Sequence, residues 1–435
     1  MMNKWYILFF VTSAVWGSSI DGIRLPVVGS LFPLRIAILI FGVILWYKTY
    51  VSSEHLTIIQ TSVFSTKRLR NNTAFTFVAM IFFGLLTMYW AYNKMLVIVD
   101  IVTWITSFVC IFICFTCLKN KNDVIFAARI FIINFLIIGS IGIYESFTGD
   151  YFDLAYEYYT RQKNVFDLYM PASIMFNINN LAVFMALSMP VCFLGTYGLK
   201  GKMYWDFLLM AFGEMVTVLT GCNTALVLFC FIFVLYIYMN KEKKTAWVVV
   251  LAVIMILVAF SSVVANVFDE ILSFSAASEP RWNLWKNSIG VAWKYKFMGV
   301  GPGNSSIVNT VFKVDNVAET GRSHNYLLTV FEEFGIVAFC IFAIWLAKWC
   351  KSFVDVYMNN RTSMIKYALM FIVIFFPSTF CMSSMIGYFY YWLELGLFMS
   401  LAEMVEADGY NDEEIKLLNQ KFINDKINRL KSKKV

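Results

Sequence analysis

About twelve apolar segments dominate this chain of 435 residues, and most are long enough to cross a lipid bilayer. We expect them at 5–20, 31–50, 74–92, 95–118, 124–147, 172–197, 203–220, 222–239, 245–266, 325–350, 364–381 and 385–402. A soluble core could not enclose so much apolar surface, since only 14% of the residues are charged, against about 25% in soluble domains. The sequence therefore predicts an all-α fold, a polytopic membrane bundle of about twelve transmembrane helices.

The positions of Lys and Arg predict how this bundle is oriented. An even number of spans places both termini on one side. If that side is cytoplasmic, 24 of the 35 Lys and Arg residues lie inside, as the positive-inside rule requires. We therefore expect a multi-pass protein of the cytoplasmic (inner) membrane with both termini cytoplasmic. The expected domains are 1–402, with an outer loop at about 267–323, and a charged cytoplasmic tail, 403–435.

The outer loop carries a segment, 279–297, with the pattern of a short interfacial helix. Trp282, Trp285, Ile289 and Trp293 or Ala292 can share one helical face, which suits a helix lying on the outer leaflet. Plain membrane anchoring explains this face. A functional interpretation adds Arg281, whose planar guanidinium can hold a phosphate through two parallel hydrogen bonds.

The glycine-rich stretch MGVGPGNSS, 298–306, follows that helix. It lacks the G-K-[ST] ending of a nucleotide-binding loop and is expected on the outer side, so we reject a nucleotide site. Its residues indicate a tight turn.

His324 is one of only two histidines, and it lies where a polar loop becomes an apolar helix. A neutral imidazole is suited to general-base catalysis near pH 7, and a helix N-terminus favours anions. The structural alternative is that His324 caps the helix. Arg322 precedes it by two residues. Glu332 and Glu333, about two helical turns further on, are second-choice bases, because that depth is too great for a hydrated acceptor.

Further ionisable residues fall within or at the ends of the expected spans, where they face a cavity or pair with one another. A proton-coupled transporter would use the same set, so they do not discriminate between functions. They are Arg35, Asp100, Glu145, Asp206, Glu214, Glu332, Glu333 and Glu394. Cys110, Cys114 and Cys117 share one helical face, and we interpret them as packing residues. No basic face for nucleic acid occurs, and we predict no metal and no cofactor.

Four stretches together resemble the O-antigen ligase and polymerase family of membrane proteins. They are FNINNLAVFMALSMP (176–190), VLTGCNTALVLF (218–229), RWNLWKNSIGVAWKYKFMGVGPGN (281–304) and SHNYLLTVFEEFGIVAF (323–339). The last two are the most specific. The resemblance covers roughly residues 130–400.

The resemblance implies a metal-independent glycosyl transfer, from a polyprenyl-diphosphate-linked glycan, on the outer face of the inner membrane. It implies that Arg281 binds the diphosphate and that His324 activates or orients the acceptor hydroxyl. Further candidate substrate-binding residues are Arg322, Asn325, Arg161, Asn223 and Glu332. Asn223 stands where the family often has an arginine, in the turn TGCNT, and Arg322 or Arg161 would have to replace that contact.

The sequence therefore predicts a polymerase that joins lipid-linked repeat units of an O-antigen, capsule or exopolysaccharide. The alternatives are a ligase that transfers the finished glycan to a lipid A core or other acceptor, and a flippase without covalent chemistry. The expected partners are the lipid-linked donor, the glycan acceptor and membrane lipid, with a flippase and a chain-length regulator as further partners and no nucleic acid.

Overall fold

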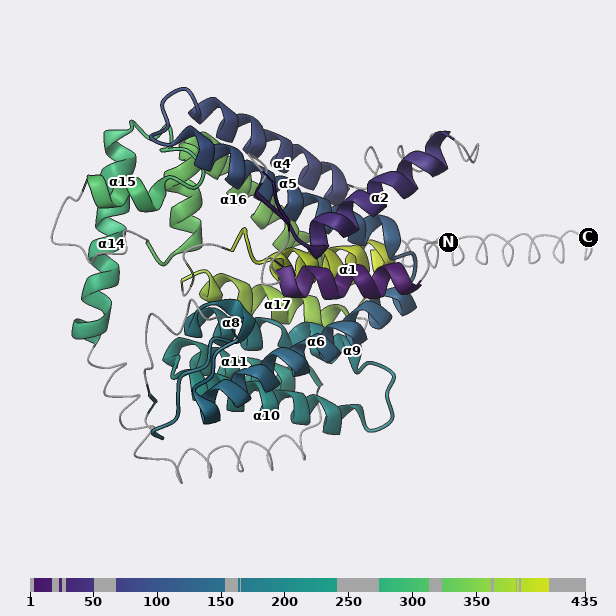
Figure 1. Ribbon diagram of the computed structural model, residues 1–435. Helices are drawn as coiled ribbons and strands as arrows, with labels where there is room; N and C mark the ends of the chain where they lie inside the picture. The colour runs from purple at the N-terminus through teal and green to yellow at the C-terminus, as the bar shows by residue number, and fades with distance from the viewer. Residues whose placement is uncertain are drawn as a thin grey trace, which may run out of the picture.

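The computed structural model describes residues 4–17, 23–25, 29–50, 68–152, 163–164, 166–240, 274–312, 323–360, 364–380, 382 and 385–406. As the sequence predicts, most of them are helical (Figure 1). The helices are α1 (Lys4–Trp16), α2 (Pro33–Tyr50), α4 (Arg68–Thr87), α5 (Lys94–Cys117), α6 (Lys121–Thr148), the short η2 (Ser173–Met175), α8 (Ile178–Leu187), α9 (Met189–Gly195), α10 (Lys202–Thr220), α11 (Asn223–Asn240), α14 (Phe274–Lys294), α15 (Ser305–Val311), α16 (Tyr326–Asn360), α17 (Ile365–Ser378) and a last helix, 389–406.

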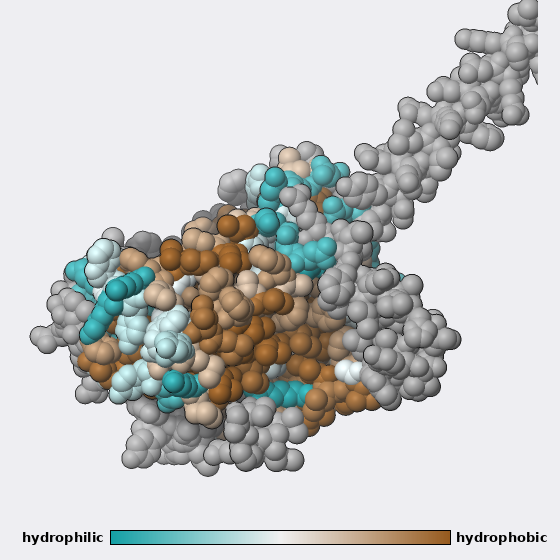
Figure 2. Space-filling view, turned by 90° about the horizontal axis from the view of Figure 1, so that it is seen from above, coloured by the Kyte–Doolittle hydropathy of each residue, from teal (hydrophilic) through white to brown (hydrophobic). Residues whose placement is uncertain are grey.

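Several of these helices can cross a membrane. Within the described ranges, five segments are long and apolar enough, namely α5, α6, α8 with α9, α10 and α16, and four shorter helices are also apolar. Figure 2 shows a broad hydrophobic surface across the middle of the molecule, with hydrophilic residues toward either end. The chain is thus membrane-embedded, whereas the expected count of about twelve spans is not confirmed, and the expected span 245–266 lies outside the described residues.

Three local expectations need correction. A short antiparallel hairpin, β1 (Ile23–Leu25) and β2 (Gly29–Leu31), interrupts the all-α pattern. The expected span 172–197 is not one helix, because η2 ends at Phe176, which has a left-handed φ of 56°. The last span continues to residue 406, where Val405 is still buried.

The last helix, 389–406, runs through the centre of the bundle and packs along α5 (Figure 1). Ser107 donates through Oγ to the carbonyl of Ile386 at 2.9 Å, and one turn further the Cys110 thiol faces the carbonyl of Phe389 at 3.9 Å. The next thiol is that of Cys114, and a Cβ at Gly396 would lie 2.9 Å from its sulfur. These contacts agree with the packing interpretation of the cysteines.

The two ends of the bundle differ in character. At one end, called here the basic end, lie the connections 118–121 and 196–202 with Lys119, Lys121, Lys200 and Lys202. Arg70 pairs there with Glu403 at 2.7 Å. At the opposite end, called here the loop end, lie residues 295–305 and 323–325. Figure 1 shows α14 crossing the loop end, while α1 begins and helix 389–406 ends at the basic end.

Candidate functional site

The site is built first around the start of α16. Asn325 precedes the helix, and its Oδ1 accepts a hydrogen bond from the Leu328 backbone N–H at 3.1 Å, which is the geometry of an N-cap. Ser323 is buried, and its hydroxyl lies 2.8 Å from that of Thr329. Asn325, and not His324, therefore caps α16.

His324 itself has an unusual backbone. Its φ is 47°, in the left-handed region that non-glycine residues rarely adopt, and its side chain is half-buried. Other non-glycine residues with this feature are Asp167, Phe176, Lys296 and Phe297, in loops, and Ser173, the first residue of η2. Such residues persist only where the surroundings fix them, and they concentrate at functional sites.

The helix of the outer loop lies directly against this segment. Trp285 of α14 donates through Nε1 to the carbonyl of Ser323 at 2.9 Å, and its ring contacts that of Phe380, with 5.9 Å between centroids. Arg281 lies four residues, about one helical turn, before Trp285 in α14. The structure therefore brings the turn that carries Arg281 next to the residue before His324. The side chain of Arg281 lies outside the described atoms.

The other face of α14 matches its expected exposure. Trp282, Ile289 and Trp293 are 54%, 50% and 72% exposed, as the sequence predicts for an interfacial helix. Trp285, which was grouped with them, instead turns its indole toward the loop, where its N–H finds a partner.

The glycine-rich turn binds protein backbone. α16 is broken at Gly335, where φ is 82° and ψ is 174°, and residues 297–301 dock at the break. The N–H groups of Val300 and Gly301 donate to the carbonyls of Glu332 and Glu333 at 2.9 and 3.0 Å, and Ile336 N–H donates to the carbonyl of Phe297 at 2.9 Å. The turn is thus tight, as expected, and two motifs that are distant in sequence form one unit.

The two glutamates of α16 lie beneath this turn. Glu332 is fully buried, and its Oε2 accepts from Asn309 Nδ2 of α15 at 3.2 Å. Glu333 Oε1 accepts from the Ser305 hydroxyl at 2.7 Å. Both carboxyl groups thus hold α15, and substrate contact by Glu332 stays a prediction.

Two further acidic residues within the spans have partners inside the protein. Glu145 is fully buried, and its carboxylate accepts from the backbone N–H groups of Phe152, Ala172 and Ser173 at 2.7–2.9 Å. Asp206 pairs with Lys202 and also accepts from the Tyr236 hydroxyl. These residues hold loops and helix ends in place. Of the two alternatives from the sequence, a cavity or a partner, they have partners within the protein.

The remaining predicted site residues are less well placed. Arg322 and Arg161 lie outside the described residues. Asn223 begins α11, directly after a left-handed turn at Gly221, and its side chain is not described. Sequence reasoning missed Ser305 and Asn309, although both are polar residues in a segment that must pack against the start of α16.

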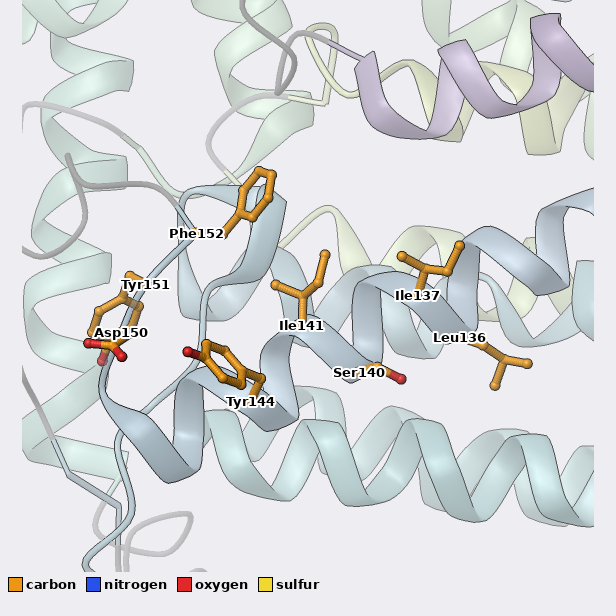
Figure 3. A pocket seen from close by; sticks show the side chains of 8 residues that line it. All are labelled: Leu136, Ile137, Ser140, Ile141, Tyr144, Asp150, Tyr151 and Phe152. Carbon is orange, nitrogen blue, oxygen red and sulfur yellow. The ribbon is translucent and has the colours of Figure 1, made fainter.

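A groove of about 540 Å³ lies elsewhere, along α6 (Figure 3). Apolar side chains form its wall, and Tyr144 and Asp150 lie at one end. The lining residues are Leu136, Ile137, Ser140, Ile141, Tyr144, Asp150, Tyr151 and Phe152. None of them belongs to the predicted site.

Comparison with known proteins finds a family model that matches part of the chain. Residues 207–343 match the family model described as O-antigen ligase. The matched segment includes Arg281, the glycine-rich turn and His324. No curated protein matches the chain. Residues 207–343 are therefore similar to the O-antigen ligase family, in agreement with the resemblance to the O-antigen ligase and polymerase family.

Proposed function

We propose that this protein is a polymerase that joins polyprenyl-diphosphate-linked oligosaccharide repeat units. The observation that carries the proposal is the hydrogen bond from Trp285 to the Ser323 carbonyl. It seats the helix of Arg281 beside His324, within the segment that matches the family. In this proposal, Arg281 supplies the cationic group and His324 the general base, both from segments at the loop end.

The proposed reaction uses these two groups in different ways. A sugar hydroxyl is a poor nucleophile, so His324 removes its proton as the oxygen attacks the anomeric carbon of the donor. The bond from that carbon to the diphosphate oxygen breaks, and polyprenyl diphosphate leaves. Arg281 stabilises the negative charge that develops on the diphosphate. Arg322, Arg161 and Asn223 are proposed as further substrate contacts, and the transfer is proposed to need no metal.

The lipid part of the donor fixes where this chemistry takes place. Its polyprenyl chain stays in the bilayer, so the reacting atoms must lie at the membrane surface. The exposed tryptophans of α14 suit that surface, because indole rings favour the interface. We place the loop end outside and the basic end in the cytoplasm of the inner membrane, since short basic loops are typical of the cytoplasmic side.

A ligase is the second candidate, because the matching family model is described as O-antigen ligase. Both reactions use the same donor and differ in the acceptor. A polymerase transfers the growing glycan to another lipid-linked repeat unit, whereas a ligase transfers it to a different molecule such as a lipid A core.

Purified protein in lipid nanodiscs, supplied with a lipid-linked repeat unit alone, distinguishes these candidates. A ladder of products on a gel supports the polymerase, whereas transfer only after a second acceptor is added supports the ligase. We expect the ladder to persist in EDTA. Arg281→Lys should lose most product at normal membrane abundance, because lysine cannot form two parallel bonds to the diphosphate. A full ladder from Arg281→Ala would remove this residue from the mechanism.

A further inference from the structure

A buried polar network joins the three helices at the loop end. Asn287 of α14 donates through Nδ2 to Asn309 Oδ1 of α15 at 3.0 Å, and Asn309 Nδ2 donates to Glu332 Oε2 of α16 at 3.2 Å. Asn309 Nδ2 also lies 3.3 Å from Ser288 Oγ. All four side chains are at most 2% exposed. A buried network of this kind is stable only in one arrangement of its helices, because any shift leaves polar groups without partners.

Apolar packing at the same interface is limited in extent. Val291 of α14, Val300 of the glycine-rich turn and Val308 of α15 form a small cluster, separate from the main core. Such packing favours contact but does not set one register, because apolar contacts are non-directional. The hydrogen bonds of Asn309 and Glu332 are directional, so they can fix the register of the three helices. A second clamp, from Ser305 to Glu333, fixes the start of α15 to the next residue of α16.

We propose that Asn309 and Glu332 are positioning residues that set where α14, and with it Arg281, lies relative to His324. This inference rests on the proposed function for the roles of those two residues. Glu332 acts through α15 and α14, because its side chain is fully buried and faces Asn309 and Ser288. It is therefore not the base that the sequence offered as an alternative to His324.

Two substitutions separate positioning from chemistry. Glu332→Gln keeps a carbonyl oxygen that accepts from Asn309 but removes the acid group, so we expect this variant to retain most polymer formation. Asn309→Leu has a similar size but no polar atoms, and we expect roughly 10²-fold slower polymer formation, as small misplacements of reacting groups cause. Thr310→Val is the matched control, because Thr310 lies on the exposed side of α15 and bonds only within it. It should behave as the unmodified protein.

A distance measurement shows whether α14 moves. In a cysteine-free background, spin labels at Ile289 of α14 and Ile344 of α16, both exposed, report the separation of the two helices. We expect Asn309→Leu to shift or broaden this distance distribution. A second pair, Phe82 of α4 and Ile344, should remain unchanged, which shows that the bundle itself is folded.

The outcomes are distinct. Loss of polymer in Glu332→Gln at normal abundance would overturn the inference, because it assigns the acid group itself a chemical role. An unchanged Ile289–Ile344 distance in Asn309→Leu would also overturn it. If Arg281→Ala and His324→Asn both remain active, the proposed function fails, yet the label distances still show whether the network positions α14.

Discussion

At the scale of single residues, the left-handed backbone of His324 indicates which substitution best tests its imidazole. Among non-glycine residues, asparagine is one of the most tolerant of this conformation. His324→Asn should therefore keep normal membrane abundance, while polymer formation falls by roughly 10²- to 10⁴-fold, as general-base loss predicts. The lipid-linked single repeat should accumulate.

Lys296→Asn provides the control for this experiment. Lys296 is exposed and has a similar φ of 54°. Substitution by asparagine there tests the same backbone conformation at a residue outside the proposed site. It should remain active. Long polymer from His324→Asn would exclude the imidazole as the base.

At the scale of elements, the contact between the glycine-rich turn and the break in α16 should be essential to stability. A Cβ at Gly299 would lie 2.5 Å from the carbonyl oxygen of Glu333. We expect Gly299→Ala to destabilise the protein by roughly 2–5 kcal/mol, from the left-handed backbone and the clash together. Gly198 has a similar φ of 80° but open space around it, so Gly198→Ala measures the backbone part alone. Thermal unfolding in detergent would compare the two, and equal melting temperatures would contradict the docking role.

The sequence predicts some of these elements better than others. Apolar segments reveal helices because burial in lipid demands them, so the positions of α5, α6 and α16 follow from composition. The contact of Gly299 with Gly335 does not follow, because it depends on a tertiary approach between residues 36 positions apart. The sequence also does not show which residue caps α16. His324 and Asn325 are neighbours, and only the backbone geometry shows which side chain accepts from Leu328.

At the scale of the whole molecule, the two ends of the bundle should face different compartments. In a cysteine-free background, a single cysteine at Thr310, which is exposed at the loop end, should react with a membrane-impermeant maleimide in intact spheroplasts. A cysteine at Lys200, which is exposed at the basic end, should react only after permeabilisation. The reverse pattern would invert the proposed orientation.

The break in α16 also limits how relatives of this protein can recombine. The glycine-rich turn and α16 form backbone hydrogen bonds with each other, so neither segment can be exchanged without the other. A chimera can join the outer loop of one relative to the α16 of another. If that α16 lacks a glycine at the position of Gly335, buried N–H and carbonyl groups would be left without hydrogen-bond partners. Crossover points before α14 and beyond Ile336 would keep this pair of backbone segments together.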